Sequence, residues 1–268
     1  MVSASPLEGA HLAHYGRTMT RVSRQEALLN LIHARRSVTT SELEAALGAS
    51  AATVRRDLAQ LEEVGKLRRT FGGALAIEAK DDPFSEVLEV SRDAKLAIAQ
   101  AAASQIEDGQ TVILDVGTTT HYLAAQLANR RLTIITGSLS VLDVLAGAPE
   151  VALILLGGEY VTEYRCVTGP FVEDALRDIR ADHAFLGCSG VTDAGDIRDT
   201  TVSQAQIKRA ILRASERSTL LVDSAKFPGV GHAAVASIST LDAIITNSPL
   251  PDSVEELRRA SGTELVVA

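Results

Sequence analysis

Apolar side chains change their spacing along this chain. Near the start, Ala27, Leu28, Leu31 and Ile32 recur at helical spacing and predict a helix over residues 21–35. Beyond about residue 110 the apolar residues stand in short unbroken runs bounded by glycine and polar residues, which is typical of buried strands. The change predicts two parts of different architecture, a small helical head and an α/β body.

A second helix is predicted to begin at Thr39 or Thr40 and to end at Leu47-Gly48. Thr39 and Glu42 have the spacing of a capping box, in which each side chain bonds the backbone N–H of the other residue. Gly48 suits the left-handed residue that follows many helices.

A third helix is predicted to follow, capped by Ser50 and running to about Val64. Val54, Leu58 and Leu61 form its apolar stripe, because they recur every three or four residues. Because the stripe faces the core, the opposite face of the helix is expected to be outward. That face carries Ala52, Arg56 and Ala59, flanked by Thr53 and Arg55.

The second and third helices have the order of a helix-turn-helix, and the basic, glycine-tipped stretch after them predicts a wing hairpin. Thr53 is predicted to contact a phosphate or a base edge, and one of Arg55 and Arg56 to reach guanine while the other holds the backbone. Two arginines alone are as readily a solvated helix face, but the turn, cap, stripe and hairpin in this order favour DNA binding. The predicted DNA-binding residues are Ser50, Ala52, Thr53, Arg55, Arg56, Lys66, Arg68, Arg69, Gly72 and Gly73.

Charge divides the chain in the same place. Residues 17–80 hold 11 basic and 7 acidic residues, whereas residues 81–268 hold 15 basic and 26 acidic ones. The net charge of −8 for the whole chain therefore hides a basic head on an acidic body. This asymmetry is expected when only the head meets phosphates.

The body alternates predicted strands and helices. The strands are expected over residues 111–115, 132–136, 151–156, 183–186, 219–222 and 243–245, and the helices over residues 94–105, 119–128, 139–145, 172–178, 204–215 and 254–260. This alternation predicts an α/β, Rossmann-like sheet covered on both faces. We expect a disordered tail at residues 1–19, a winged helix-turn-helix at 20–78, a polar linker at 79–91 and an effector-binding domain at 92–268.

Polar or glycine-rich loops follow five of the predicted strands, at the sheet edge where α/β proteins bind ligands. Residues 115–120 open a helix, and their backbone N–H groups and three hydroxyls predict an anion site. Lys208 and Lys226 are the candidate counter-charges for a phosphate, although Lys208 is as readily a solvent-facing helix residue. The predicted effector-binding residues are Asp115, Gly117, Thr118, Thr119, Thr120, Gly137, Ser138, Gly158, Lys208 and Lys226.

The head, with Thr53-Val54-Arg55-Arg56-Asp57-Leu58 and a wing ending in Gly72-Gly73-Ala74, resembles that of the DeoR family of bacterial transcriptional regulators. Lys95-Leu96-Ala97-Ile98-Ala99, Gly157-Gly158 and Asp223-Ser224-Ala225-Lys226-Phe227 extend the resemblance over about residues 21–247. The resemblance implies a body similar in fold to ribose-phosphate isomerases and CoA transferases, which senses phosphorylated sugars or related metabolites. It also implies that residues 117–120 and Lys226 bind the phosphate or sugar of the effector.

Three positions depart from the pattern of that family. Phe71 stands where the family usually has a histidine, Gly137 where it has an asparagine, and Gln204 where it has a glutamate. The departures remove a polar group from the wing and an amide and a carboxylate from the predicted pocket. The contact made by the wing and the identity of the effector therefore stay open.

The first functional hypothesis is a repressor of a carbohydrate or related operon, assembled as a dimer or tetramer and released from double-stranded operator DNA by a phosphorylated sugar. The second is a DNA-binding scaffold whose body no longer senses a ligand. The third is a sugar-phosphate isomerase, which needs a carboxylate base. Asp115, Asp193 and Asp196 are the candidates for that base, although Asp115 at a strand end is more simply an acceptor that fixes its loop.

Composition bears on metal binding, on the state of the cysteines and on the cellular compartment. Cys166, Cys188 and the six histidines lack the spacing of ligands, so we predict reduced thiols, no metal and no cofactor. No apolar run reaches the roughly 18 residues that a membrane span needs, and the start has no signal-peptide pattern. We therefore expect a cytoplasmic protein that binds no membrane.

Overall fold

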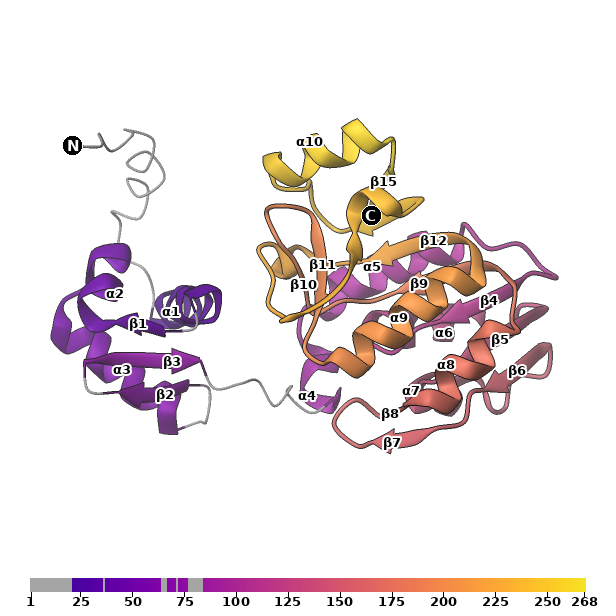
Figure 1. Cartoon of the computed structure of the whole chain (residues 1–268), viewed down its shortest axis with the longest axis horizontal. Coiled ribbons are helices and arrows are strands. Elements are labelled where there is room, and N and C mark those ends of the chain that lie inside the picture. Colours follow the sequence, from indigo (N-terminus) through magenta and orange to yellow (C-terminus); the bar gives the residue numbers. More distant parts are fainter. Residues whose placement is uncertain (1–20, 36, 64–66, 71, 77–83) are drawn as a thin grey trace. The chain divides into compact units, whose positions relative to one another are not determined.

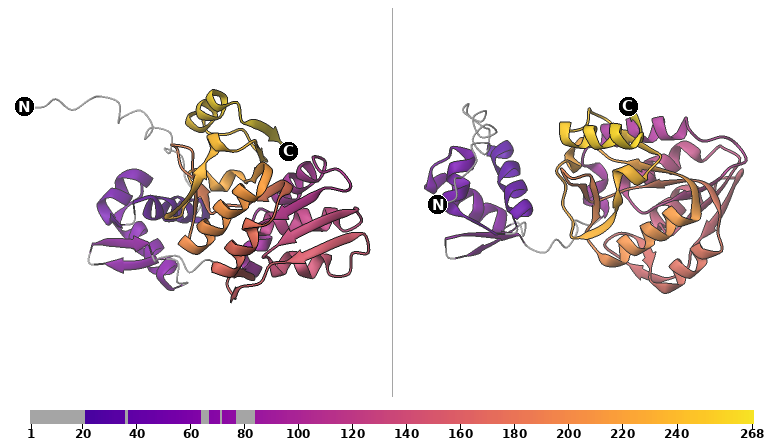
Figure 2. Two further views of the ribbon diagram at one scale, coloured as in Figure 1. Left: turned by 45° about the vertical axis from the view of Figure 1, so that its right-hand side comes forward. Right: turned by 45° about the horizontal axis from the view of Figure 1, so that its top comes forward.

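The structure is a computed structural model that describes residues 21–35, 37–63, 67–70, 72–76 and 84–268 (Figure 1). Its contacts divide the chain into two compact units, Met1–Lys80 and Asp81–Ala268, which Figure 2 shows from two further sides. The expected tail at residues 1–19 lies outside the described residues, as do Lys66 and Phe71 of the wing.

In its described residues, the first unit holds three helices and a small sheet. The helices are α1 (Arg21–Arg35), α2 (Thr40–Leu47) and α3 (Ala51–Glu63), in agreement with the apolar spacing. The strands β1 (Ser37–Thr39), β2 (Leu67–Thr70) and β3 (Gly73–Ala76) pair antiparallel in the order β1-β3-β2. β2 and β3 form the predicted wing hairpin, whereas β1 is too short to show an alternating pattern in the sequence.

The predicted helix ends are confirmed. The Thr39 hydroxyl accepts the backbone N–H of Glu42 at 3.3 Å, and the Glu42 carboxylate accepts the backbone N–H of Thr39 at 2.7 Å. Gly48 ends α2 with a left-handed φ of 60°, and the Ser50 hydroxyl accepts the backbone N–H of Thr53 at 3.3 Å. Between the helices lies a core that includes Leu28, Ile32, Leu43, Val54, Leu58 and Leu61, and each fully buried aliphatic side chain contributes about 1.5–3 kcal/mol.

The second unit is built on a seven-stranded parallel sheet. Its strands are β4 (Thr111–Leu114), β5 (Leu132–Thr136), β6 (Val151–Leu155), β9 (Ala181–Leu186), β12 (Ser215–Leu221), β14 (Ala243–Thr246) and β15 (Glu264–Val267). Their spatial order is β15-β14-β12-β9-β4-β5-β6. The six predicted strands are confirmed, and β15 adds an edge.

Helices cover both faces of the central strands (Figures 1 and 2). One face packs against α5 (Arg92–Ala103), α6 (Thr118–Leu127) and α7 (Leu139–Leu145), and the other against α8 (Pro170–Arg177) and α9 (Val202–Ala214). Adjacent residues of β4 divide between these layers, with Val112 and Leu114 in the first core and Ile113 in the second. The α/β architecture expected from the sequence is therefore confirmed.

Smaller elements complete the second unit. A helix, α10 (Asp252–Ser261), and a sheet of β10 (Gly190–Val191), β11 (Asp196–Asp199) and β13 (Ala233–Ser237) enclose a third core. A hairpin pairs β7 (Glu159–Val161) with β8 (Cys166–Thr168). Two short 3-10 turns, η1 (Ser224–Lys226) and η2 (Ile238–Thr240), follow β12 and β13.

The strand order reverses between β4 and β9. From β4 the chain proceeds outward through β5 and β6, whereas from β9 it proceeds the other way through β12, β14 and β15. Open α/β sheets bind ligands in the crevice that opens at such a reversal, beyond the carboxyl ends of the strands. Asp115 directly follows β4 and Gly187 directly follows β9, so these two positions mark the crevice.

Residues 84–89 correct the expectation of a polar linker. They form a helix, α4 (Phe84–Glu89), inside the segment 79–91 that the sequence predicts as a connector. Phe84 is buried, with its ring edge-on to His121 of α6 at a centroid distance of 5.9 Å. Because the residues around Phe84 are polar, the sequence does not show the apolar spacing of a helix here. The helix depends on the contact between Phe84 and His121.

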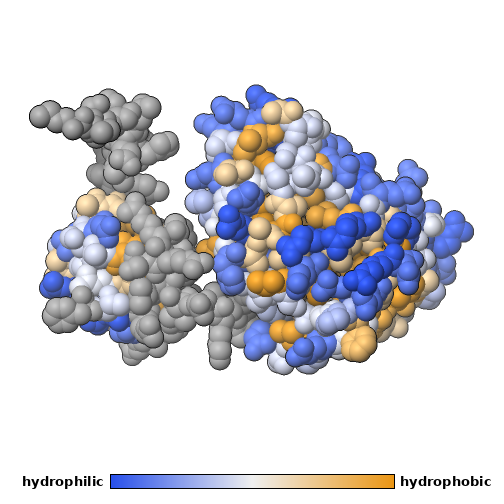
Figure 3. Space-filling view, in the orientation of Figure 1, coloured by the Kyte–Doolittle hydropathy of each residue, from blue (hydrophilic) through white to orange (hydrophobic). Residues whose placement is uncertain are grey.

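The expectation of a sheet covered on both faces is wrong at one edge. In β6, Ile154 and Leu155 are 47% and 43% exposed. Apolar residues also reach the surface at the β6 end of the body in Figure 3.

In the part of the chain that the structure describes, no helix is long and apolar enough to cross a bilayer.

Candidate functional site

The outward face of α3 presents the residues expected to contact DNA. Ala52, Arg55 and Arg56 are exposed, and Ser50 is exposed at the helix start. Thr53 is half-buried, with its hydroxyl 3.0 Å from that of Ser50. Because Val54 and Leu58 are buried on the opposite side, the arginine pair is held outward by the packing of its own helix.

Asp57 anchors α3 from the inside. Its carboxylate is buried and accepts Nε of Arg24 at 2.6 Å and the side-chain amide of Gln25 at 3.3 Å. Both donors come from α1, so the pairing fixes the orientation of α3 against α1. Sequence reasoning missed this role, although a carboxylate next to Leu58 of the apolar stripe is the signal that could have revealed it.

The wing is tied to the helices at two points. The backbone N–H of Arg69 donates to the Glu62 carboxylate at 2.8 Å, and the Arg69 side chain is exposed. The carbonyl of Gly72 accepts both the backbone N–H and the hydroxyl of Thr40, at 2.8 and 3.0 Å. The side chain of Arg68 lies outside the described residues, as do Lys66 and Phe71.

Gly73 corrects one predicted DNA contact. It is buried, and a Cβ atom there would lie 2.2 Å from the carbonyl oxygen of Val38. The close approach that this glycine permits is therefore to β1 within the head, since no side chain fits between the two strands. The exposed Gly72, with φ of 111°, remains the position where a turn needs glycine.

The loop after β4 opens α6 without a side-chain cap. Gly117 has φ of 147° and ψ of 165°, a conformation essentially restricted to glycine, and no side chain bonds the helix start. The backbone N–H groups of the first helical residues have no intrahelical partner, so they can bind an anion. Of the three predicted hydroxyls, that of Thr120 is buried and donates to the Gly117 carbonyl at 2.9 Å. The Thr120 hydroxyl is therefore already occupied within the loop.

A buried ion cluster lies behind this loop. Lys208 of α9 is 2% exposed, and its ammonium contacts the carboxylate of Asp115 and lies 3.3 Å from that of Asp199. Burial by itself lowers the pKa of Lys208, but the two carboxylates raise it above the usual value of a lysine. Lys208 is therefore held in its charged form.

The structure corrects the expected role of Lys208. The sequence offered two readings, a counter-charge for a phosphate or a solvent-facing residue, and the buried ion cluster fits neither. Two carboxylates already neutralise the ammonium, so Lys208 is not a free cation for an effector. It fixes Asp115 and Asp199 instead, and Asp199 was not predicted as part of the site.

One carboxylate oxygen of Asp115 accepts hydrogen bonds, and the other has no partner among the described residues. Its Oδ2 accepts the backbone N–H of Gly187 at 3.1 Å as well as the Lys208 ammonium, so the expected loop-fixing role fits this atom. Its Oδ1 is buried and has no hydrogen-bond partner among the described residues. A buried acceptor without a partner is costly, and here it lies at the crevice between β4 and β9.

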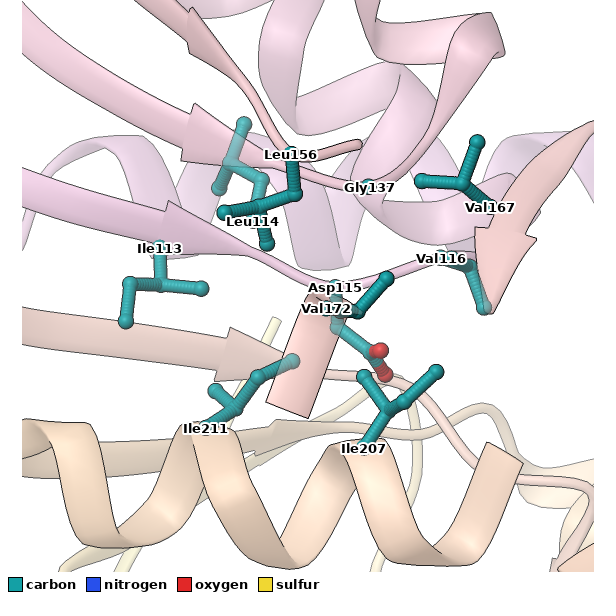
Figure 4. A pocket seen from close by; sticks show the side chains of 10 residues that line it. All are labelled: Ile113, Leu114, Asp115, Val116, Gly137, Leu156, Val167, Val172, Ile207 and Ile211. Atoms are coloured by element: carbon teal, nitrogen blue, oxygen red, sulfur yellow. The ribbon is translucent and has the colours of Figure 1, made fainter. Parts of the chain in front are cut away.

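A small cavity adjoins Asp115. Its volume is about 10 Å³, roughly the room for one water molecule, and it is lined mainly by apolar side chains such as Val116, Val167 and Ile207. Figure 4 shows the Asp115 carboxylate directed toward α9, beside Ile207. Gly137 also lines the cavity, so the structure brings together two predicted residues from neighbouring strands.

Three other predicted effector-binding residues, Ser138, Gly158 and Lys226, differ in what they contact. Ser138 is buried, where its hydroxyl accepts the Val141 N–H and lies 2.9 Å from the Ser140 hydroxyl, so it serves as the cap of α7. Gly158 lies against the β7–β8 hairpin, since a Cβ atom there would be 2.5 Å from the Thr168 carbonyl oxygen. Lys226 is half-buried in η1 and has no ion-pair partner among the described residues.

Polar side chains other than Asp199 also surround the ion cluster. Gln204 is buried, and its amide donates to Sγ of Cys166 at 3.6 Å. Burial raises the pKa of the Cys166 thiol to about 12, so it stays protonated. Both cysteines are free thiols, and no group of three or more candidate ligands within the described ranges is arranged to hold a metal ion.

The carboxylates considered as catalytic bases are occupied or exposed. Asp115 contacts Lys208, Asp196 pairs with Arg198 at 3.0 Å, and Asp193 is exposed. A base needs a free carboxylate at the reacting carbon, and this arrangement favours a binding site over a catalytic one.

Comparison with known proteins assigns both units. The model of the DeoR-like helix-turn-helix domain matches residues 24–80, and that of the DeoR C terminal sensor domain matches residues 90–248. The chain is 32% identical over 241 residues to the glycerol-3-phosphate regulon repressor of Escherichia coli, covering 89% of this chain and 96% of that repressor. It is 30% identical over 235 residues to the L-fucose operon activator of Haemophilus influenzae, covering 87% and 94%. Among solved structures, ribose 5-phosphate isomerase A from Methanocaldococcus jannaschii aligns with a TM-score of 0.38 and 20% identity over 51% of this chain and 54% of the isomerase.

Proposed function

This chain belongs to the DeoR family of DNA-binding transcriptional regulators, and we propose that it represses a carbohydrate or related operon until a phosphorylated sugar or similar metabolite releases it from operator DNA. The relatives are named as regulators and not as enzymes. The H. influenzae relative is named as an operon activator. Activation of the operon by this chain is therefore the alternative that a promoter assay can reveal. Because bacterial operator DNA lies in the cytoplasm, we propose that compartment for this regulator.

One observation carries the effector proposal. The uncapped start of α6 lies beside the crevice where the strand order reverses, and it begins with a glycine in a conformation that other residues avoid. Backbone N–H groups at a helix start favour a phosphate. The open Oδ1 of Asp115 supplies an acceptor for a sugar hydroxyl, and Lys226 supplies a cation without an ion-pair partner among the described residues.

Gly117→Ala should remove effector binding and leave DNA binding intact. A Cβ atom disfavours φ of 147° by about 1–3 kcal/mol, so the N–H groups at the start of α6 lose their arrangement. We expect at least a tenfold weaker response in a thermal-shift screen with glycerol 3-phosphate, ribose 5-phosphate, fructose 1-phosphate and inorganic phosphate. In the unsubstituted chain, an effector at 100 times its Kd adds about 2.7 kcal/mol of stability.

Gly109→Ala is the matched control for that screen. Gly109 also has a positive φ, of 93°, and a Cβ atom there meets nothing within 4 Å. The control should keep the effector response, although it too places a side chain at a glycine of positive φ. Equal responses from the two variants would contradict the anion site, and an unsubstituted chain that responds to no sugar phosphate would support a body that no longer senses a ligand.

We further propose that two copies associate through β6, because regulators of this kind read paired half-sites as dimers. The strand is five apolar residues at the edge of the sheet, without the lysine or proline that protects such edges. Two identical edge strands can pair antiparallel about a two-fold axis. The pairing would cover the exposed side chains of Ile154 and Leu155.

Ile154→Glu should therefore weaken self-association at least about tenfold, because each copy would place a charge in the apolar contact. Sedimentation velocity over a range of concentrations measures the effect, and operator affinity should fall with it. Val267→Glu is the control, since Val267 is 51% exposed on β15 at the opposite edge. An unchanged oligomer in the Ile154 variant, or an equal loss in the Val267 variant, excludes this interface.

A further inference from the structure

The helix α4 is the first element of the second unit, and it is seated directly on the helix that begins at the predicted effector loop. The Phe84 ring meets His121 edge-on at 5.9 Å with an interplanar angle of 75°. The Tyr122 hydroxyl donates to the carbonyl of Leu88 at 3.2 Å. His121 and Tyr122 follow Thr120 in α6, so any shift of the first turn of α6 reaches both contacts.

A second contact joins α4 to α5. Lys95 is buried, and its ammonium donates to the carbonyl of Val87 at 2.6 Å. Burial lowers the pKa of Lys95 to about 8, and the charges of Asp223 and Lys226 act on it in opposite directions. Because Lys95 lies on α5, this hydrogen bond ties α4 to the helix that follows Ser91.

A third contact runs through the β7–β8 hairpin. The backbone N–H of Phe84 donates to the carbonyl of Glu163 at 3.1 Å. The next residue, Tyr164, has its hydroxyl 2.6 Å from that of Thr200, and Thr200 adjoins Asp199 of the buried ion cluster. Contacts from α5, α6 and the β7–β8 hairpin therefore converge on one short helix.

Two residues that flank the contacts of α4 have a left-handed backbone conformation. Ser91, between α4 and α5, has φ of 54° and caps α5 without a side-chain hydrogen bond. Arg165, two residues after Glu163, has φ of 50°. These are the two residues other than glycine that have a positive φ in the described ranges, a conformation that costs about 1–2 kcal/mol per residue and is typical of switch regions.

We propose that α4 is the relay of this regulator: docked on α6 it holds the operator-binding arrangement, and effector binding at the start of α6 frees it to pivot about Ser91. Lys95 and Tyr122 act as positioning residues that hold the docked state. The inference rests on the proposed function, because it assigns the regulation of the same effector site. Residues 77–83 join α4 to the head along the chain, so a pivot of α4 moves the point at which the head is attached.

Reciprocity makes the relay testable. If docking and effector binding compete, a variant that weakens docking binds the operator less tightly and the effector more tightly. A variant that merely destabilises the unit weakens both. The test uses the full chain, DNA from the intergenic region beside its own gene, and the same panel of glycerol 3-phosphate, ribose 5-phosphate, fructose 1-phosphate and inorganic phosphate.

Phe84→Ala and Tyr122→Phe are the two test variants. Tyr122→Phe removes one hydroxyl and keeps the ring, so it reports on docking even if Phe84→Ala folds poorly. For each variant we expect the Kd for DNA to rise and the Kd for the sugar phosphate to fall, by about 3- to 10-fold for Tyr122→Phe. Val90→Ala is the control, because Val90 is 60% exposed just beyond α4, and both its constants should stay unchanged.

The outcomes separate the relay from the function on which it rests. Opposite changes in the two constants support the relay. If the unsubstituted chain responds to a sugar phosphate but Tyr122→Phe leaves both constants unchanged or weakens both, the relay is wrong and the proposed function stands. If no sugar phosphate binds the unsubstituted chain or alters its DNA binding, the proposed effector response and the relay are both overturned.

Discussion

Replacing Arg55 and Arg56 together by alanine should weaken operator binding at least about 100-fold without unfolding the head. A two-point contact between arginine and guanine is worth about 1–3 kcal/mol, and the second arginine adds a phosphate contact. Both side chains are exposed, and neither forms an ion pair with another described residue. Their loss therefore leaves the buried stripe of α3 and the Arg24–Asp57 pair in place.

Salt dependence distinguishes this loss from a general change in charge. Each phosphate contact that disappears should reduce the slope of log K against log salt by about one. Electrophoretic shifts with DNA from the intergenic region beside its own gene, repeated at several salt concentrations, measure both the affinity and the slope. Circular dichroism and thermal unfolding check that the helices persist.

The matched control is the double variant Arg131→Ala with Arg213→Ala. These two arginines are exposed on the second unit, so the control removes the same net charge from the chain. It should bind DNA within about threefold of the unsubstituted chain, because neither arginine belongs to the helix-turn-helix unit expected to contact the DNA. An operator shift by the Arg55 and Arg56 variant that matches this control would overturn the assignment of α3.

Lys208→Met should destabilise the second unit by about 3–5 kcal/mol. Removing one partner of a buried ion pair leaves an uncompensated charge, and here Asp115 and Asp199 would both lose their cation. Methionine keeps much of the length of the side chain, so the effect comes from charge more than from a cavity. For a unit of this size the loss lowers Tm by roughly 10 °C.

The pH dependence of that loss has a definite sign. Burial raises the pKa of Asp115 in the folded state, and removing Lys208 removes the cation that opposes this rise. Between the unfolded and the folded pKa of Asp115 the folded chain binds more protons than the unfolded chain, so stability falls as pH rises through this window. The deficit of Lys208→Met should therefore be smaller at pH 5 than at pH 8, as measured by urea unfolding.

Arg213→Met is the control for the same helix. Arg213 is exposed on α9, so its replacement should change stability by less than about 0.5 kcal/mol. Adding Asp115→Asn and Asp199→Asn to Lys208→Met should recover part of the loss, because a neutral amide costs less to bury than an unpaired carboxylate. A near-neutral effect of Lys208→Met alone would mean that the cluster is not a buried ion pair in solution.

Local patterns in the sequence predicted most of the secondary structure. The capping box at Thr39 and Glu42, the left-handed Gly48 and the stripe of Val54, Leu58 and Leu61 all depend on residues within a few positions of one another. The strands of the body are recognisable for the same reason, because buried parallel strands are short unbroken apolar runs. From these patterns the sequence by itself determined a DNA-reading head and an α/β body.

Only the tertiary structure decided which polar residues are free to bind a ligand. Lys208 and Asp115 are 93 positions apart, and no spacing predicts that they pair. Gly73 is buried because β1 lies against it, and Phe84 holds a helix in a polar segment because His121 lies above it. Periodicity reports contacts along one helix or strand, whereas the burial of a charge depends on elements that meet only when the chain has folded.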